Sequence, residues 1–193
     1  ANYPPSANNA SKTALTWRKY LDEQYANGIW NTNACPIVIR YAEVLLTYAE
    51  AVNELSGPSA DVYDKLDLIR GRVGMPKVDR EKYASKETLR RLIRRERGVE
   101  LAGEGVRRAD ILRWKDDNGK MVAETVLNGV LERVVGTVNY AETDPTKRAE
   151  IDTNAPATDK KIEDRVFKVH NRYNPIPQGA IDNNPNLEQN AGY

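Results

Sequence analysis

The sequence contains few of the side chains on which enzyme chemistry most often depends. Its 193 residues include one histidine, His170, and one cysteine, Cys35. A single cysteine excludes a disulfide within the chain. No Gly-x-Ser-x-Gly elbow and no cluster of metal ligands occurs in the sequence. A lone histidine in a polar segment is typical of a surface residue, so we expect no catalytic residue, no metal and no cofactor.

Long apolar runs are also missing. No uninterrupted stretch approaches the roughly 18–20 residues that a helix needs to span a bilayer. The first residues, Ala1-Asn2-Tyr3-Pro4-Pro5, lack the basic start and apolar middle of a secretory signal. Their composition is that of a polar loop in which the sequence has been cut, so we expect any export signal to be encoded upstream.

An excess of charge of one sign is absent too. Lys and Arg number 29 and Asp and Glu number 28, which gives a formal net charge of +1. This balance indicates neither nucleic-acid binding nor attraction to an anionic membrane. The run Arg94-Arg95-Glu96-Arg97 mixes both signs, and we interpret it as a salt-bridged, solvated helix face.

The apolar spacing in the middle of the chain predicts a helical hairpin. Four apolar side chains starting at Tyr41 recur at i, i+4, i+7 and i+11, and a polar stripe with the same spacing lies opposite. We expect Tyr41 and Tyr48 in the core. Ser56-Gly57-Pro58-Ser59 predicts a turn and an N-cap, followed by a helix from about Ala60 to Arg72. Residues 39–73 are close in length to the roughly 34-residue tetratricopeptide unit.

Further helices are predicted beyond this hairpin. Ser85 should cap a third helix that ends near residues 103–105. Short helices are expected over Val106–Trp114 and within 116–135, and Arg165–Val169 has the pattern of a strand. The tail from Asn174 to Tyr193 holds three prolines, so we expect it to be irregular and to wrap around the helices. The apolar residues expected to pack on the third helix are Leu89, Leu92, Ile93 and Val99.

Four stretches of the sequence, taken in order, carry a family resemblance. They are Ile39-Arg40-Tyr41-Ala42-Glu43-Val44-Leu45-Leu46, Leu68-Ile69-Arg70-Gly71-Arg72-Val73-Gly74-Met75-Pro76, the stretch from Ile93 to Trp114 with Glu104-Gly105, and the ending from Asn174-Pro175-Ile176-Pro177-Gln178 to Gly192-Tyr193. In this order they resemble the C-terminal portion of the SusD/RagB family. The resemblance covers residues 35–115 and 165–193.

The resemblance implies a fold and a role. Members of this family are outer-membrane lipoproteins of Bacteroidetes that lie over a SusC-like TonB-dependent transporter and capture oligosaccharide or another nutrient. It also implies that an N-terminal half, with the lipid-anchored cysteine and much of a tetratricopeptide-like scaffold, lies outside this chain. We expect attachment to the membrane only through that anchor.

Glu96 and Glu100 are the best pair of carboxylates for chemistry. They lie one helical turn apart, as the acid and base of a glycosidase could. However, the surrounding arginines would hold both acids ionised. Glu96 also continues the apolar stripe of its helix, so we expect it at a packing interface, paired with Arg40 or Arg70.

Arg107, Asp110 and Arg113 suggest a second structural clamp. Asp110 and Arg113 would be i, i+3 neighbours on one helix, with Trp114 docking the end of that helix. We interpret these three charged residues as members of structural ion pairs.

Aromatic residues provide the candidate ligand site. The chain has 10 Tyr and 3 Trp but one Phe, so most of its aromatic rings carry a polar group. Flat rings and planar amides suit the apolar faces and hydroxyls of sugars. The predicted ligand-binding residues are Trp17, Tyr20, Tyr25 and Trp30, interleaved with Asn31 and Asn33; the alternative is that they pack beneath polypeptide outside this chain.

These observations predict an all-α fold of tetratricopeptide-like hairpins, an α-α superhelix with long irregular C-terminal loops. We expect one domain, with a polar lead-in over 1–38, a helical core over 39–115, a variable insert over 116–164 and a wrapping tail over 165–193. The predicted function is non-catalytic capture of glycan for a TonB-dependent transporter. The alternatives are a helical scaffold that binds a protein or peptide, and a glycoside hydrolase.

Overall fold

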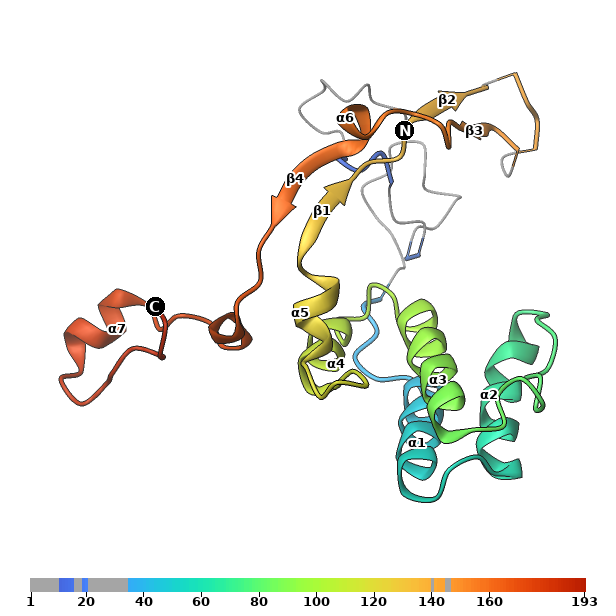
Figure 1. The fold of residues 1–193 in the computed structure, drawn as a ribbon, viewed down its shortest axis with the longest axis horizontal. Coiled ribbons are helices and arrows are strands. Elements are labelled where there is room, and N and C mark those ends of the chain that lie inside the picture. The colour runs from blue at the N-terminus through green and yellow to red at the C-terminus, as the bar shows by residue number, and fades with distance from the viewer. Residues whose placement is uncertain (1–10, 16–18, 21–34, 140, 145–146) are drawn as a thin grey trace. The chain divides into compact units, whose positions relative to one another are not determined.

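The computed structural model describes residues 11–15, 19–20, 35–139, 141–144 and 147–193, drawn in colour in Figure 1. The chain divides into two compact units. We name Lys19–Asp110 the helical unit, and Ala1–Arg18 with Ile111–Tyr193 the ribbon unit. The predicted all-α fold is confirmed, with short strands added. The single domain stays a prediction.

The helical unit begins with the predicted hairpin of α1 (Tyr41–Ser56) and α2 (Ala60–Arg72). Gly57 ends α1 at φ +79°, a left-handed conformation that glycine adopts without steric cost. Ser59 caps α2, because its hydroxyl accepts a hydrogen bond from the Val62 N–H at 3.4 Å. Both local signals lie in the turn between the helices, which is why the sequence was sufficient to predict it.

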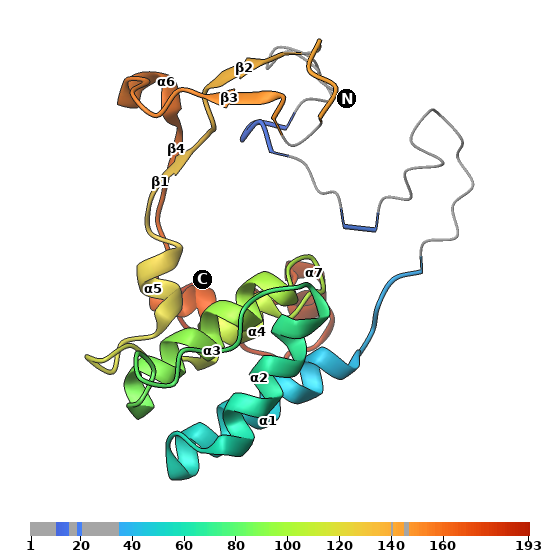
Figure 2. The ribbon, with the colours of Figure 1, turned by 90° about the vertical axis from the view of Figure 1, so that its right-hand side faces the viewer.

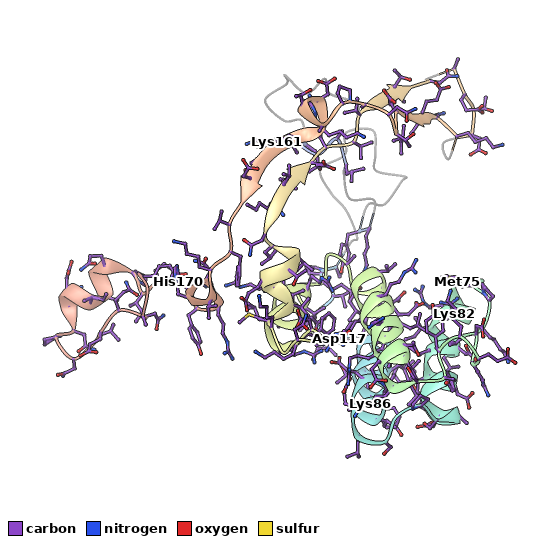
Figure 3. The ribbon with its side chains drawn as sticks, in the orientation of Figure 1. Met75, Lys82, Lys86, Asp117, Lys161 and His170 are labelled. Carbon is purple, nitrogen blue, oxygen red and sulfur yellow. The ribbon has the colours of Figure 1, made fainter. Side chains whose placement is uncertain are left out.

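The third helix, α3 (Lys86–Glu100), lies beside α1 (Figures 1 and 2). Ser85 caps it as predicted, since the Thr88 N–H donates to the Ser85 hydroxyl at 3.2 Å. Lys86, labelled at the start of α3 in Figure 3, donates its ammonium to the Glu54 carbonyl at the end of α1. The Asn53 amide donates to the Lys86 carbonyl at 3.0 Å. These bonds fix the end of α1 to the beginning of α3.

The core of the helical unit differs in part from the prediction. Tyr41 is 71% exposed and Tyr48 is 44% exposed, so placing them in the core was wrong, and Val99 is exposed as well. One hairpin and one further helix cover only one side of α1, and that side carries Leu45, Leu46 and Ala49 instead. Each large apolar side chain buried there contributes roughly 1.5–3 kcal/mol. The core consists of Leu45, Leu46, Ala49, Val62, Tyr63, Leu66, Ile69, Val78, Leu89, Leu92, Ile93 and Leu101.

Arg97 of α3 is buried, although the run that contains it was predicted to be a solvated face. Only 6% of the residue is exposed. Its Nε donates to Asp110 Oδ2 at 2.7 Å, and its Nη1 donates to Thr47 Oγ1 at 3.0 Å. A carboxylate and a hydroxyl offset the cost of burying the guanidinium. The charge pattern of α3 could not show this burial, because the partners lie on other helices.

The ribbon unit has a smaller apolar cluster around Trp114. The predicted helix within 116–135 is present only as α5 (Val122–Val126), because Gly129 turns the backbone at φ +104° and a strand follows. Asn128 starts this strand: its Oδ1 accepts from the Phe167 N–H at 2.6 Å and its Nδ2 donates to the Phe167 carbonyl at 3.2 Å. The cluster consists of Ile111, Trp114, Met121 and Ala123, with Phe167 packed against it.

Two antiparallel ribbons give this unit its name. The strand β1 (Gly129–Glu132) pairs with β4 (Lys161–Arg165), and β2 (Gly136–Val138) pairs with β3 (Ala149–Ile151), as Figure 2 shows. The predicted strand over Arg165–Val169 is therefore displaced, since β4 ends where it was expected to begin. The remaining elements here are α4 (Arg107–Arg113), which starts in the helical unit, α6 (Ala157–Lys160) and the 3₁₀ helix η2 (Val169–Arg172).

The C-terminal tail closes on itself. Gln189 forms two bonds with Ile176, accepting from its N–H at 2.8 Å and donating to its carbonyl at 2.9 Å. The ring of Tyr193 lies edge-on to His170, labelled in Figure 3, with ring centroids 4.9 Å apart. The expectation of an irregular tail was wrong for α7 (Gln178–Asn183), which follows Pro177 directly. That the tail wraps the helices stays a prediction.

Removing the carboxylate partner of Arg97 should destabilise the chain strongly. We expect Asp110→Ala to lower the free energy of unfolding by about 3–5 kcal/mol, because it leaves a buried guanidinium uncompensated. Urea denaturation of the 193-residue chain, followed by far-UV circular dichroism, measures this change.

An exposed ion pair provides the matched control. Asp64 accepts from Arg80 at 3.1 Å, and both side chains are more than half exposed. Asp64→Ala should therefore lower the free energy of unfolding by less than about 1 kcal/mol. Equal losses for the two variants would contradict the importance that we give to burial.

Candidate ligand-binding site

A cavity of about 230 Å³ lies in the helical unit, between the segment before α1 and the loop after α3. Tyr20 supplies an aromatic ring, Pro36 and Ile37 supply apolar walls, and Glu104 supplies a carboxylate. Cys35 and Gly103 complete the lining. Tyr20 is thus the one predicted ligand-binding residue that the described part of the chain places at a cavity.

The conformation of Tyr20 is unusual. Its φ is +67°, in the left-handed region that side chains other than glycine rarely adopt. Such a conformation costs roughly 1–2 kcal/mol and persists where neighbouring contacts hold it. The neighbouring Lys19 supplies these contacts, because its ammonium donates to the Glu100 carbonyl at 3.0 Å, to the Ala102 carbonyl at 2.9 Å and to the Glu104 carboxylate.

Glu104, which lines the cavity, is held in place by two cations. Arg40 Nε donates to Oε2 of Glu104 at 2.7 Å and to Oε1 at 2.8 Å, and Lys19 donates to Oε1 as well. The same arginine donates through Nη1 to Glu100 Oε1 at 2.6 Å, and Arg72 reaches this oxygen at 2.8 Å. The network joins the segment before α1 to the end of α3 and to α2. It therefore fixes the walls of the cavity.

Electrostatics keep the carboxylate of Glu104 ionised. Burial raises its pKa, but the hydrogen bonds from Arg40 and Lys19 together lower it more, so the pKa lies below the usual value of 4.5. The hydrogen bond to Glu104 raises the pKa of Arg40 despite the opposing effect of burial. A carboxylate in this state can accept hydrogen bonds from a ligand but is a poor proton donor.

The family model described as "SusD family" matches residues 1–193, the whole chain. The chain belongs to the SusD family. The resemblance found in its four sequence stretches is thereby confirmed.

Individual relatives agree with this assignment. The SusD-like protein P25 of Formosa agariphila is 40% identical over 79 residues, which is 40% of this chain and 15% of the relative. The SusD-like protein P2 of the same organism is 38% identical over 93 residues, 46% of this chain and 18% of the relative. The crystal structure of a SusD-like protein from Bacteroides fragilis is 28% identical with a TM-score of 0.61, covering 82% of this chain and 26% of that one. The matches thus span about a quarter or less of the relatives' length.

The two carboxylates considered for glycosidase chemistry in this SusD-family chain are both held by arginines. Glu96 binds Arg70, with both side chains mostly buried. Glu100 is bound by Arg40 and Arg72, so Arg40 pairs with Glu100 and Glu104. Neither Glu96 nor Glu100 lines the cavity at Tyr20. This arrangement favours structural roles for both.

The remaining predicted residues lie elsewhere. Asp110 binds Arg97 of α3, a partner that the sequence did not indicate. The guanidinium of Arg113 lies over the ring of Trp114, 5.2 Å from its centroid, and Arg107 begins α4. Trp17, Tyr25 and Trp30, with Asn31 and Asn33, fall outside the described residues.

Sequence reasoning missed most of the cavity lining. Ile37 and Pro36 precede a helix and show no periodicity, and Glu104 lies in a loop. The one available signal was Glu104-Gly105, which occurs in the third resembling stretch. Over the described residues, no group of three His, Cys, Asp or Glu side chains gathers as a metal site. No helix of that part is long and apolar enough to cross a membrane.

The lowered pKa of Glu104 predicts how stability depends on pH. Because the pKa of the folded state lies below 4.5, the ionised group stabilises the fold fully above pH 4.5, and this contribution is lost as the pH falls through the folded value. We expect Glu104→Gln to flatten the decline of the unfolding free energy between pH 5 and about 3. Urea titrations at a series of pH values measure it. An unchanged pH profile in Glu104→Gln would show that other acids cause the decline.

Proposed function

We propose that this chain is a non-catalytic glycan-binding part of a cell-surface protein of the SusD family. In the complete protein it would capture oligosaccharide and deliver it to a SusC-like TonB-dependent transporter of the outer membrane. The observation that carries the proposal is the match of the family model over the whole chain. A lipid anchor supplied by polypeptide outside these residues would hold it at the cell surface.

The chemistry of the cavity supports a sugar as ligand. A pyranose ring has apolar C–H faces, which pack on an aromatic ring such as Tyr20 and on an aliphatic wall such as Ile37. A carboxylate offers about four acceptor positions. The Arg40 and Lys19 bonds occupy three of these positions on Glu104, whose side chain is only 3% exposed, so this acid mainly fixes the wall of the cavity.

The size of the cavity favours one ring of a longer chain. Its volume of about 230 Å³ lies below the roughly 300–1,000 Å³ typical of sites for whole small molecules. One sugar unit would occupy it, and the neighbouring units would continue into solvent. Weak binding at each such site suits a protein that must release its ligand unchanged to a transporter.

We also propose that this chain does not break glycosidic bonds. A glycosidase needs one carboxyl group that stays protonated near neutral pH and one that is ionised. The acid at the cavity, Glu104, is held ionised by two cations, and Glu96 and Glu100 bind arginines away from it. Among the residues that the structure describes, these pairs leave no carboxyl group suited to protonate a leaving sugar at this cavity.

Replacing the aromatic ring tests the sugar site. We expect Tyr20→Ala to weaken binding to a soluble polysaccharide about 2–10-fold, because an aromatic contact contributes about 0.5–1.5 kcal/mol, and Tyr20→Phe to retain it. Affinity electrophoresis against a panel of polysaccharides and, in parallel, a panel of peptides measures this. Tyr173→Ala is the control, since this exposed tyrosine belongs to the ribbon unit.

The panels also separate the competing functions. If peptides retain the chain and no polysaccharide does, glycan capture is wrong. The alternative function, a helical scaffold that binds a protein partner, would then take its place. Equal loss of binding in Tyr20→Ala and Tyr173→Ala would remove the cavity from the proposal while leaving glycan capture in place.

A second test addresses catalysis directly. Glu96→Gln and Glu100→Gln should each lower the free energy of unfolding by about 1–3 kcal/mol, because each breaks hydrogen bonds of a mostly buried ion pair. Incubation of the wild-type chain with the bound polysaccharide should release no reducing ends. Release that disappears in either variant would establish hydrolysis instead.

A further inference from the structure

The short segment Lys19–Tyr20 is attached to the rest of the helical unit through one side-chain atom. In the part of the chain that the structure describes, the hydrogen bonds of this segment all start from Nζ of Lys19. They end on the Glu100 carbonyl at 3.0 Å, on the Ala102 carbonyl at 2.9 Å and on the Glu104 carboxylate. Three directed bonds from one ammonium therefore hold the segment that carries Tyr20.

The acceptors of these bonds gather where α3 ends. The last carbonyl groups of a helix have no partner within it, and the helix dipole favours a cation beside them. Glu100 is the last residue of α3, and Ala102 lies just beyond it. Glu104 follows in a turn between two glycines with positive φ angles. The end of α3 is thus suited to bind an ammonium group, and Lys19 supplies one.

The ammonium of Lys19 is fully occupied by these bonds. A lysine side chain has three N–H donors and no acceptor. Three acceptors lie within hydrogen-bond distance of it, so no donor is left for a sugar hydroxyl. Lys19 is also not among the residues that line the cavity. An effect of Lys19 on ligand binding would therefore act through the residues that it holds.

Tyr20 is the lining residue that depends most directly on Lys19. It follows Lys19 in the chain, and its φ of +67° is a conformation that persists only where neighbouring contacts hold it. The Lys19 ammonium also lies over the Tyr20 ring, 5.8 Å from the ring centroid, within the range of a cation–π attraction. Without the ammonium, the backbone would relax and the ring would lose its place at the cavity.

We propose that Lys19 is the positioning residue of the glycan cavity, where its ammonium holds Tyr20 in the conformation that presents the ring to a sugar. This inference rests on the proposed function, and it adds to the site a residue that contacts no sugar. A ring that is already in place loses less conformational freedom on binding than a ring that the sugar must order. Lys19 thus contributes to affinity by preorganisation.

The experiment is a double-mutant cycle in the 193-residue chain. Affinity electrophoresis uses the polysaccharide of the panel that retains the wild-type chain most strongly. Lys19→Met should weaken retention about 2–10-fold, as Tyr20→Ala does, because either change removes the ring from the cavity. The double variant Lys19→Met/Tyr20→Ala should bind within about twofold of Tyr20→Ala alone. Lys19→Arg should retain binding, because a guanidinium can donate to the same acceptors.

Lys86→Met is the matched control. Lys86 also donates its ammonium to a carbonyl at the end of a helix, that of Glu54 in α1, and it does not line the cavity. This variant should leave retention unchanged, and a loss equal to that of Lys19→Met would overturn the inference. Far-UV circular dichroism should show that Lys19→Met keeps the helices. Unfolding by this substitution would also overturn the inference, because Lys19 would then support the whole fold.

The cycle distinguishes this inference from the function on which it rests. If no polysaccharide retains the wild-type chain, glycan capture itself fails and the positioning role fails with it. If the wild-type chain is retained and Lys19→Met binds equally well, only the positioning role is wrong. It is also wrong if the losses of Lys19→Met and Tyr20→Ala multiply in the double variant, or if Lys19→Arg loses as much as Lys19→Met.

Discussion

The helical unit depends on one buried cation. Arg97 extends from the last turns of α3 and binds Asp110 of α4 and Thr47 of α1, so a single guanidinium connects three helices. Apolar packing between helices tolerates small rotations, whereas a buried charge with directed hydrogen bonds does not. Arg97 therefore sets the rotation of α3 relative to α1.

A second cation, Arg40, likewise connects separate segments at the cavity. It lies just before α1 and reaches two acids, Glu100 at the end of α3 and Glu104 in the loop beyond it. The segment that carries Ile37 is thereby held against the loop that carries Gly103. The cavity is thus formed by stretches without regular secondary structure, and the ion pairs give these stretches the rigidity that helices supply elsewhere.

Local signals in the sequence predicted the helices well and the site poorly. Gly57, Ser59 and Ser85 determine where helices end and begin through bonds to residues a few positions away, so the three helices and their turn could be predicted. Arg97 looked like a surface residue because its partners, Thr47 and Asp110, are distant in sequence. The ribbon was missed for the same reason, since Asn128 pairs with Phe167, 39 positions away. Partners at such separation leave no periodic pattern in a single sequence.

The pairing of Asn128 with Phe167 has a consequence for the lifetime of the protein. The side chain of Asn128 imitates a strand backbone, with one acceptor and one donor facing Phe167. Asn128 is followed by Gly129, and an asparagine before glycine loses its amide readily, because the unhindered backbone nitrogen attacks the side chain. Loss of the amide would turn the donor into a second carboxylate oxygen facing the Phe167 carbonyl. Deamidation at this one residue would thus replace a hydrogen bond at the base of the ribbon with a repulsive contact between two oxygens.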